Sequence, residues 1–198
     1  METVMNLENG WYILQDVHDT GEEQGLYTDR ESFTEMGPQI SEWEKLSELK
    51  HLQLLLAEQP YFGRELRYFN QAPWWYRYEF DLPNGKEQRI RLRFTNVDYY
   101  CKVWINGQPA GEHEGYSAPF SLDITDLVKP GEKNLLSVKV SSPWDREVEK
   151  GKEDSRTILV KRRMVKGTYE HSDTFIQRDV NPVGIYGRAE ISSTEQES

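Results

Sequence analysis

The stretch from Asp98 to Val140 most strongly constrains the fold, because short alternating segments are separated in it by tight turns. Asn106-Gly107 is the dipeptide that best tolerates positive φ at both central positions of a two-residue hairpin turn. Apolar residues then alternate with polar ones at residues 120–124 and 136–140, on either side of a turn at residues 129–132. This period of two predicts an antiparallel sheet with one buried face.

Two segments upstream show the same alternation. Residues 76–82 lead into a turn at residues 83–85, and the apolar residues of 90–94 alternate with three arginines. A row of arginines can bind an anion, but it more often faces carboxylates on a neighbouring strand, and here we expect Glu79 and Asp81 across the hairpin. The pattern predicts ten core side chains: Tyr76, Phe80, Leu92, Phe94, Val103, Ile105, Phe120, Leu122, Val138 and Val140.

A helix is predicted at the end of the acidic first third of the chain. Ser41 and Glu44 have the spacing of a capping box, and Trp43, Leu46, Leu49, Leu52 and Leu56 follow at helical spacing. We therefore expect an amphipathic helix over residues 41–57. The last seven residues, 192–198, form a polar tail that we expect to be disordered.

Several segments together resemble the N-terminal sugar-binding domain of glycoside hydrolase family 2, which includes β-galactosidases, β-glucuronidases and β-mannosidases. They are V-W-I-N-G, G-E-H-E-G-Y-S-A-P-F-S-L-D-I-T-D-L-V, G-E-K-N-L-L-S-V-K-V, W-W-Y-R-Y-E-F-D-L-P and N-P-V-G-I-Y-G-R-A-E-I. The resemblance covers the chain from Gly10 to Ile191. It implies an all-β, two-sheet antiparallel jelly-roll β-sandwich of the galactose-binding type, forming one domain over residues 1–191. The helix near residues 41–57 would be an insertion.

In the resembled family this domain is joined to a second β-sandwich and to a (β/α)8 barrel that carries two catalytic glutamates. A barrel alone takes ~250 residues, and the chain has 198. We therefore expect a noncatalytic carbohydrate-binding domain that shapes the sugar pocket of a barrel in the same or a partner chain. Alone, the chain is expected to be inactive. The alternative is an independent carbohydrate-binding or protein-interaction module.

Four residues are candidates for contact with the sugar. In the resembled family an aspartate shortly before the Gly-Ile pair helps to hold the nonreducing-end sugar, and Asp179 or Asn181 matches that position. A flat ring against the C–H face of a sugar is the other usual contact. Trp75 and Trp144 are the candidates for it, with core packing as the alternative for both.

Charge and composition exclude several other classes of function. Residues 1–60 carry the whole net charge of −10, since they hold 13 acidic and 3 basic residues. This acidic balance argues against nucleic acid as a ligand. No apolar run of about 18 residues is present, so no membrane span is expected. The N-terminus shows no signal-peptide pattern, and we expect a cytoplasmic protein.

Catalytic and metal motifs are absent from the sequence. Cys101 is the only cysteine, which excludes an internal disulfide and a multi-cysteine metal site. His113 lies in G-E-H-E-G, which matches a structural turn of the resembled family, and no G-x-S-x-G motif accompanies it. We expect no cofactor and no metal, although loop oxygens in such sandwiches can hold a structural calcium.

Overall fold

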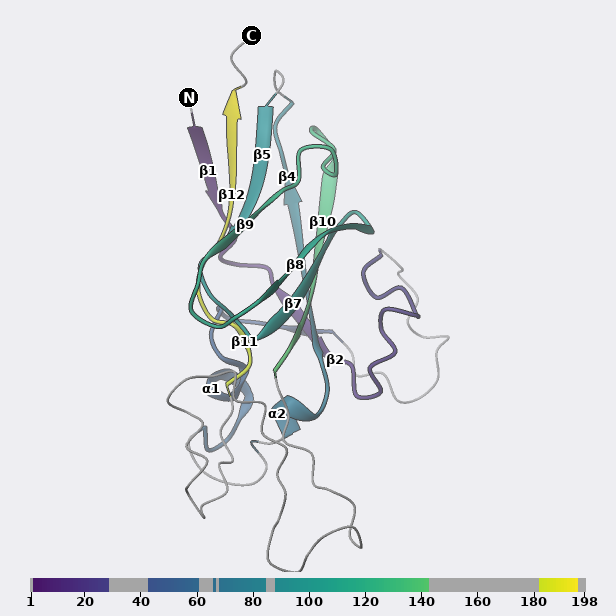
Figure 1. The fold of residues 1–198 in the computed structure, drawn as a ribbon, viewed down its shortest axis with the longest axis vertical. Coiled ribbons are helices and arrows are strands. Elements are labelled where there is room, and N and C mark those ends of the chain that lie inside the picture. The colour runs from purple at the N-terminus through teal and green to yellow at the C-terminus, as the bar shows by residue number, and fades with distance from the viewer. Residues whose placement is uncertain are drawn as a thin grey trace, which may run out of the picture.

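The protein is a β-sandwich of two antiparallel sheets (Figure 1). The computed structural model describes residues 2–28, 43–60, 66, 68–84, 88–142 and 182–195. The all-β antiparallel sandwich predicted from the sequence is confirmed.

The larger sheet has six strands in the order β3-β2-β4-β10-β7-β8. Its strands are β2 (Tyr12–Gln15), β3 (Glu44–Lys45), β4 (Trp74–Asp81), β7 (Tyr100–Ile105), β8 (Gln108–Glu114) and β10 (Lys133–Ser141). The smaller sheet has the order β1-β12-β5-β9. Its strands are β1 (Glu2–Asn6), β5 (Gln88–Phe94), β9 (Phe120–Asp123) and β12 (Ala189–Glu195).

Shorter elements gather at the end of the sandwich away from the two termini (Figure 1). They are the helices α1 (Leu52–Leu56) and α2 (Tyr68–Gln71) and the strand β11 (Gly184–Ile185). Strand β11 pairs with β6 (Val97–Asp98). Strand β11 follows closely on Asp179 and Asn181 in the sequence, and both of these residues lie outside the described ones.

The core lies between the inner faces of the two sheets. Eight of the ten predicted core side chains are buried, and Phe120 and Leu122 are partly buried against the same cluster. The hairpin at Asn106-Gly107 is also confirmed, with φ of 51° and 80°. The Asn106 side chain then donates to the Leu127 carbonyl and to Asn134 Oδ1, which ties the hairpin to the turn before β10.

The helix predicted over residues 41–57 is present only in part. Ser41 lies outside the described residues, Glu44–Lys45 is strand β3, and only Leu52–Leu56 is helical. The backbone N–H of Leu46 donates to the Trp11 carbonyl, and that of Leu52 donates to Val183. These hydrogen bonds to residues far away in the chain replace the helical ones, and Leu46 and Leu52 are buried against the sandwich.

The expected partners of the arginine row are also wrong. Strands β4 and β5 belong to different sheets, so Glu79 and Asp81 do not face it. Arg89 instead forms an ion pair with Asp123 of β9, at 2.8 Å, and Arg93 lies 3.9 Å from Glu190 of β12. Carboxylates on neighbouring strands do face these arginines, as expected, but they come from elsewhere in the chain.

The polar tail is ordered further than predicted. Strand β12 continues to Glu195 and pairs with β1 on one side and β5 on the other. The alternation of this segment is weak, because its outer positions are serine and threonine. Its backbone hydrogen bonds, rather than apolar side chains, hold it in the sheet.

Candidate functional site

The predicted sugar-binding segment is described only from Pro182 onward. Asp179, Asn181 and Trp144 lie outside the described residues. Beyond them the chain is held at Val183, whose carbonyl accepts from Leu52 N at 2.9 Å and whose N–H donates to Gln53 Oε1 at 3.2 Å. The Val183 side chain is fully buried. Helix α1 therefore anchors the end of the segment that carries the two candidate residues.

Gly184 sits at the most crowded point of this anchor. Its φ is +128°, a conformation that L side chains rarely adopt, and a Cβ there would lie 2.7 Å from the Tyr76 hydroxyl oxygen. That hydroxyl accepts a hydrogen bond from Ile185 N at 3.3 Å. Burial raises the pKa of Tyr76 well above its ordinary value, so the phenol stays protonated.

A small polar cluster lies beside the anchor and was not expected from the sequence. The His51 ring stacks on Tyr186 with 4.1 Å between ring centroids, and His51 Nε2 lies 3.4 Å from Asp98 Oδ2. Asp98 is buried, and the Tyr186 hydroxyl donates to the Tyr116 carbonyl. The four residues are far apart in the chain, so no local spacing could have indicated the cluster.

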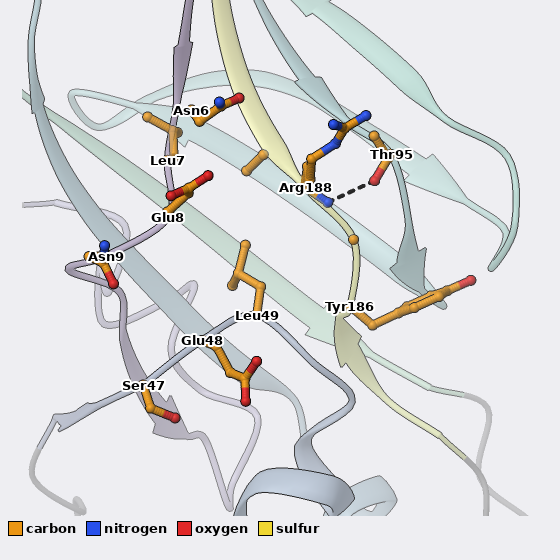
Figure 2. Close-up of a pocket in the computed structure, with 12 residues that line it drawn as sticks. Asn6, Leu7, Glu8, Asn9, Ser47, Glu48, Leu49, Thr95, Tyr186 and Arg188 are labelled. Carbon is orange, nitrogen blue, oxygen red and sulfur yellow. Dashed lines mark hydrogen bonds between the residues drawn. The ribbon is translucent and has the colours of Figure 1, made fainter.

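A pocket of about 460 Å³ opens next to Tyr186 (Figure 2). It is formed by residues 6–9, 47–49 and 186–189 together with Thr95. Figure 2 shows Leu49 between the segment of residues 6–9 and the segment of residues 186–189, with polar side chains around it. A concave site with an apolar floor and several polar groups is the usual form of a small-molecule site.

Charges of both signs border this pocket. Arg188 Nε lies 3.4 Å from Glu190 Oε1, and the Arg188 backbone N–H donates to Thr95 Oγ1 at 2.7 Å (Figure 2). Glu48 pairs with Lys50 at 2.8 Å. With donors and acceptors side by side, the pocket suits hydroxyl groups better than a single strong charge.

The proposed stacking role of Trp75 needs correction. Its ring is fully buried between Leu14, Leu26 and Trp104, and its Nε1 donates to Asp16 Oδ2 at 3.1 Å. No face of the ring is left for a sugar. A segment formed by residues 16–28, here named the covering segment, lies over this outer face of the larger sheet and explains the burial.

In the part of the chain that the structure describes, neither a nucleophilic catalytic site nor a metal site is evident. His113 lies in strand β8 and stacks on Phe120 at 4.1 Å; burial lowers its pKa, although Glu114 opposes this. Burial raises the pKa of Cys101 to about 12, so it is not a thiolate at neutral pH. The described side chains form no group of three or more His, Cys, Asp or Glu that could hold a metal ion. No helix among them is long and apolar enough to cross a membrane.

Comparison with known proteins gives one family match. The model described as "Glycosyl hydrolase 2 galactose-binding domain-like" matches residues 46–178. The chain is 36% identical over 76 residues to a β-galactosidase of Thermoanaerobacter pseudethanolicus, which covers 37% of this chain and 10% of that protein. It is 39% identical over 71 residues to a β-glucuronidase of Rattus norvegicus, covering 34% and 11%.

The fold is similar to that of larger solved structures. A β-glucuronidase of Ruminococcus gnavus superposes with a TM-score of 0.64 at 20% identity, over 97% of this chain and 28% of that chain. A β-glucuronidase of an uncultured Clostridium sp. gives a TM-score of 0.62 at 20% identity, over 98% and 29%. The chain thus spans about a tenth of the curated relatives and less than a third of these structures.

Proposed function

The chain belongs to the glycosyl hydrolase 2 galactose-binding domain-like family, and from this premise we propose that it is the noncatalytic sugar-binding domain of a family 2 glycoside hydrolase. The match to residues 46–178 carries the proposal. Nearly the whole chain superposes on 28% of a β-glucuronidase, which supports a role as one domain of a larger enzyme. A catalytic barrel and a second β-sandwich, in the same or a partner chain, complete the proposed assembly.

Within this assembly, the proposed role of the domain is to present Asp179 and Asn181 to the sugar. The position of these two residues in the sequence supports this role. Asp179 and Asn181 come shortly before the backbone at Val183 and Ile185, which buried hydrogen bonds hold in place. The domain supplies only one edge of the pocket, so it binds a free monosaccharide with millimolar affinity or weaker.

Replacement of Asp179 by Ala in the complete polypeptide tests this role. Losing a charged hydrogen bond of ~2 to 3 kcal/mol lowers kcat/KM by a factor of tens or more. Asp81→Ala, an exposed carboxylate on β4, is the matched control and leaves kcat/KM unchanged. An unchanged kcat/KM in both Asp179→Ala and Asn181→Ala would remove these residues from the sugar pocket.

The alternative function is an independent carbohydrate-binding or protein-interaction module. Such a module carries its whole site on one chain and binds some oligosaccharide with micromolar affinity. Titration calorimetry on the purified chain separates the two functions. So does the reading frame beyond Ser198, where a following β-sandwich and barrel favour the first function and a stop codon favours the second.

A further inference from the structure

A second pocket, of about 570 Å³, lies where the end of β2 meets the two helices. Its walls come from β2, α1, α2 and the start of β4, and it shares no lining residue with the pocket of Figure 2. Its volume is in the range of sites for small organic ligands. What it can bind follows from its apolar wall and from its unused polar atoms.

The apolar wall includes a ring that solvent can reach. Tyr68 is 49% exposed and Leu56 is 39% exposed, and both line the pocket. Behind them, Phe69 and Trp74 are buried and stack at 5.7 Å. Exposed apolar side chains that line a concave pocket offer a ligand an apolar contact surface.

The nitrogen donors of the buried wall each make a hydrogen bond. Trp74 Nε1 donates to the Phe69 carbonyl at 2.8 Å, and Gln15 Nε2 donates to the Tyr68 carbonyl at 2.9 Å. Among the residues that the structure describes, no lysine, arginine or histidine lines the pocket. The described lining side chains therefore leave two donors for a ligand, the Tyr68 hydroxyl and the second N–H of Gln15 Nε2.

The acceptors, in contrast, are unused. Gln15 is only 6% exposed, yet its Oε1 has no hydrogen-bond partner, and a buried acceptor without one carries an uncompensated desolvation cost. The oxygen is covered by neighbouring atoms, so a ligand can reach it only if the amide group rotates. Glu44 and Glu58 add two exposed carboxylates, for which the described residues provide no ion pair.

We propose that this pocket binds a neutral saccharide. One C–H face of the sugar lies on Tyr68 and Leu56, and its hydroxyl groups donate to Gln15 Oε1, Glu44 and Glu58. A pyranose offers both an apolar face and several donors, which matches this wall. A uronic acid would bring a third negative charge beside Glu44 and Glu58, with no cation among the described lining residues to offset it, so the pocket disfavours it.

Saturation-transfer NMR and titration calorimetry on the 198-residue chain test the proposal. The probes are the methyl β-glycosides of glucose, galactose and mannose, with sodium glucuronate as the anionic counterpart. At least one neutral probe is expected to bind with a Kd of about 1 to 10 mM, and glucuronate at least about tenfold more weakly. No saturation transfer from any neutral probe, or equal binding of glucuronate, overturns the proposal.

Variants place the binding in this pocket. Tyr68→Ala weakens it about tenfold or more, whereas Tyr68→Phe retains it. Tyr12→Ala is the matched control, because Tyr12 is a similarly exposed tyrosine of β2 that does not line the pocket. Equal losses in the Tyr68 and Tyr12 variants contradict the assignment. Asp179→Ala leaves this binding unchanged, so its outcome is independent of the sugar-pocket role proposed above.

Discussion

At the scale of one residue, Phe94 shows that alternation along a strand directs a side chain into the core. It is fully buried and stacks on Phe120 at 5.4 Å, between the two sheets. Phe94→Ala is expected to lower the free energy of unfolding by about 3 to 5 kcal/mol, through lost burial and the cavity left behind. Urea unfolding measures this cost. Val4→Ala, at an exposed position of β1, is the control, and a loss below about 1 kcal/mol for Phe94→Ala would mean that the strand face is misassigned.

Gly184 shows a constraint that the sequence pattern does not reveal. Gly184→Ala combines a positive φ with a Cβ only 2.7 Å from the Tyr76 hydroxyl oxygen, so we expect it to destabilise the fold by more than the ~1 to 3 kcal/mol of backbone strain alone. Gly10→Ala is the matched control, because its φ of +110° is similar but the nearest contact is 3.6 Å away. If the melting temperature falls equally in the two variants, the close contact with the Tyr76 hydroxyl does not contribute to the loss of stability.

At the scale of elements, ion pairs fix the covering segment on the larger sheet. Lys139 Nζ lies 2.7 Å from Asp19 and 2.8 Å from Glu22, and Lys102 lies 3.1 Å from Glu22. Burial alone would raise the pKa of Glu22, but hydrogen bonds and charge from the two lysines outweigh it and lower the pKa below its ordinary value. Burial likewise opposes the charged form of Lys139, and its two carboxylate partners still raise its pKa.

The directions of these two pKa shifts predict the pH range in which the ion pairs stabilise the fold. A carboxylate whose pKa is lowered on folding stabilises the fold above its unfolded pKa, near 4.5, and this contribution is lost as the pH falls through the folded value. The Lys139 contribution is complete below 10.5 and is lost as the pH rises through its folded pKa. The covering segment is therefore held most tightly from about pH 5 to pH 10.

A double-mutant cycle of Glu22→Gln and Lys139→Met measures the coupling free energy of this ion pair. We expect a coupling of ~1 kcal/mol at pH 7, reduced by solvent screening because Glu22 is partly exposed, and less below pH 4. Tryptophan fluorescence follows it, since Trp75 and Trp104 lie under the segment. The more exposed Lys133–Glu79 pair is the control, with a coupling near zero. A Glu22–Lys139 coupling no larger than that of the control would contradict a holding role for these charges.

The elements also show what the sequence could and could not predict. Strands with a clear period of two, such as β4 and β10, and the hairpin at Asn106-Gly107 followed from local pattern and turn chemistry. The spacing of Leu46, Leu49 and Leu52 also fitted a helix, but Leu46 and Leu52 are buried, and Leu49 partly buried, against residues far away in the chain. The pairing of β5 with β9 and β12, and the His51–Asp98–Tyr186 cluster, depend on topology that no local window contains.

At the scale of the whole molecule, the family match over residues 46–178 supports the proposed role as one domain of a family 2 glycoside hydrolase. The chain superposes on less than a third of the β-glucuronidase structures that it resembles.

Turnover by the purified 198-residue chain tests the central claim most directly. The assay uses the nitrophenyl β-galactoside, β-glucuronide and β-mannoside, with buffer as the blank. Because the catalytic glutamates are expected on a separate barrel, hydrolysis of all three substrates is predicted to equal the blank. Hydrolysis well above the blank that survives repurification of the chain would contradict the noncatalytic role.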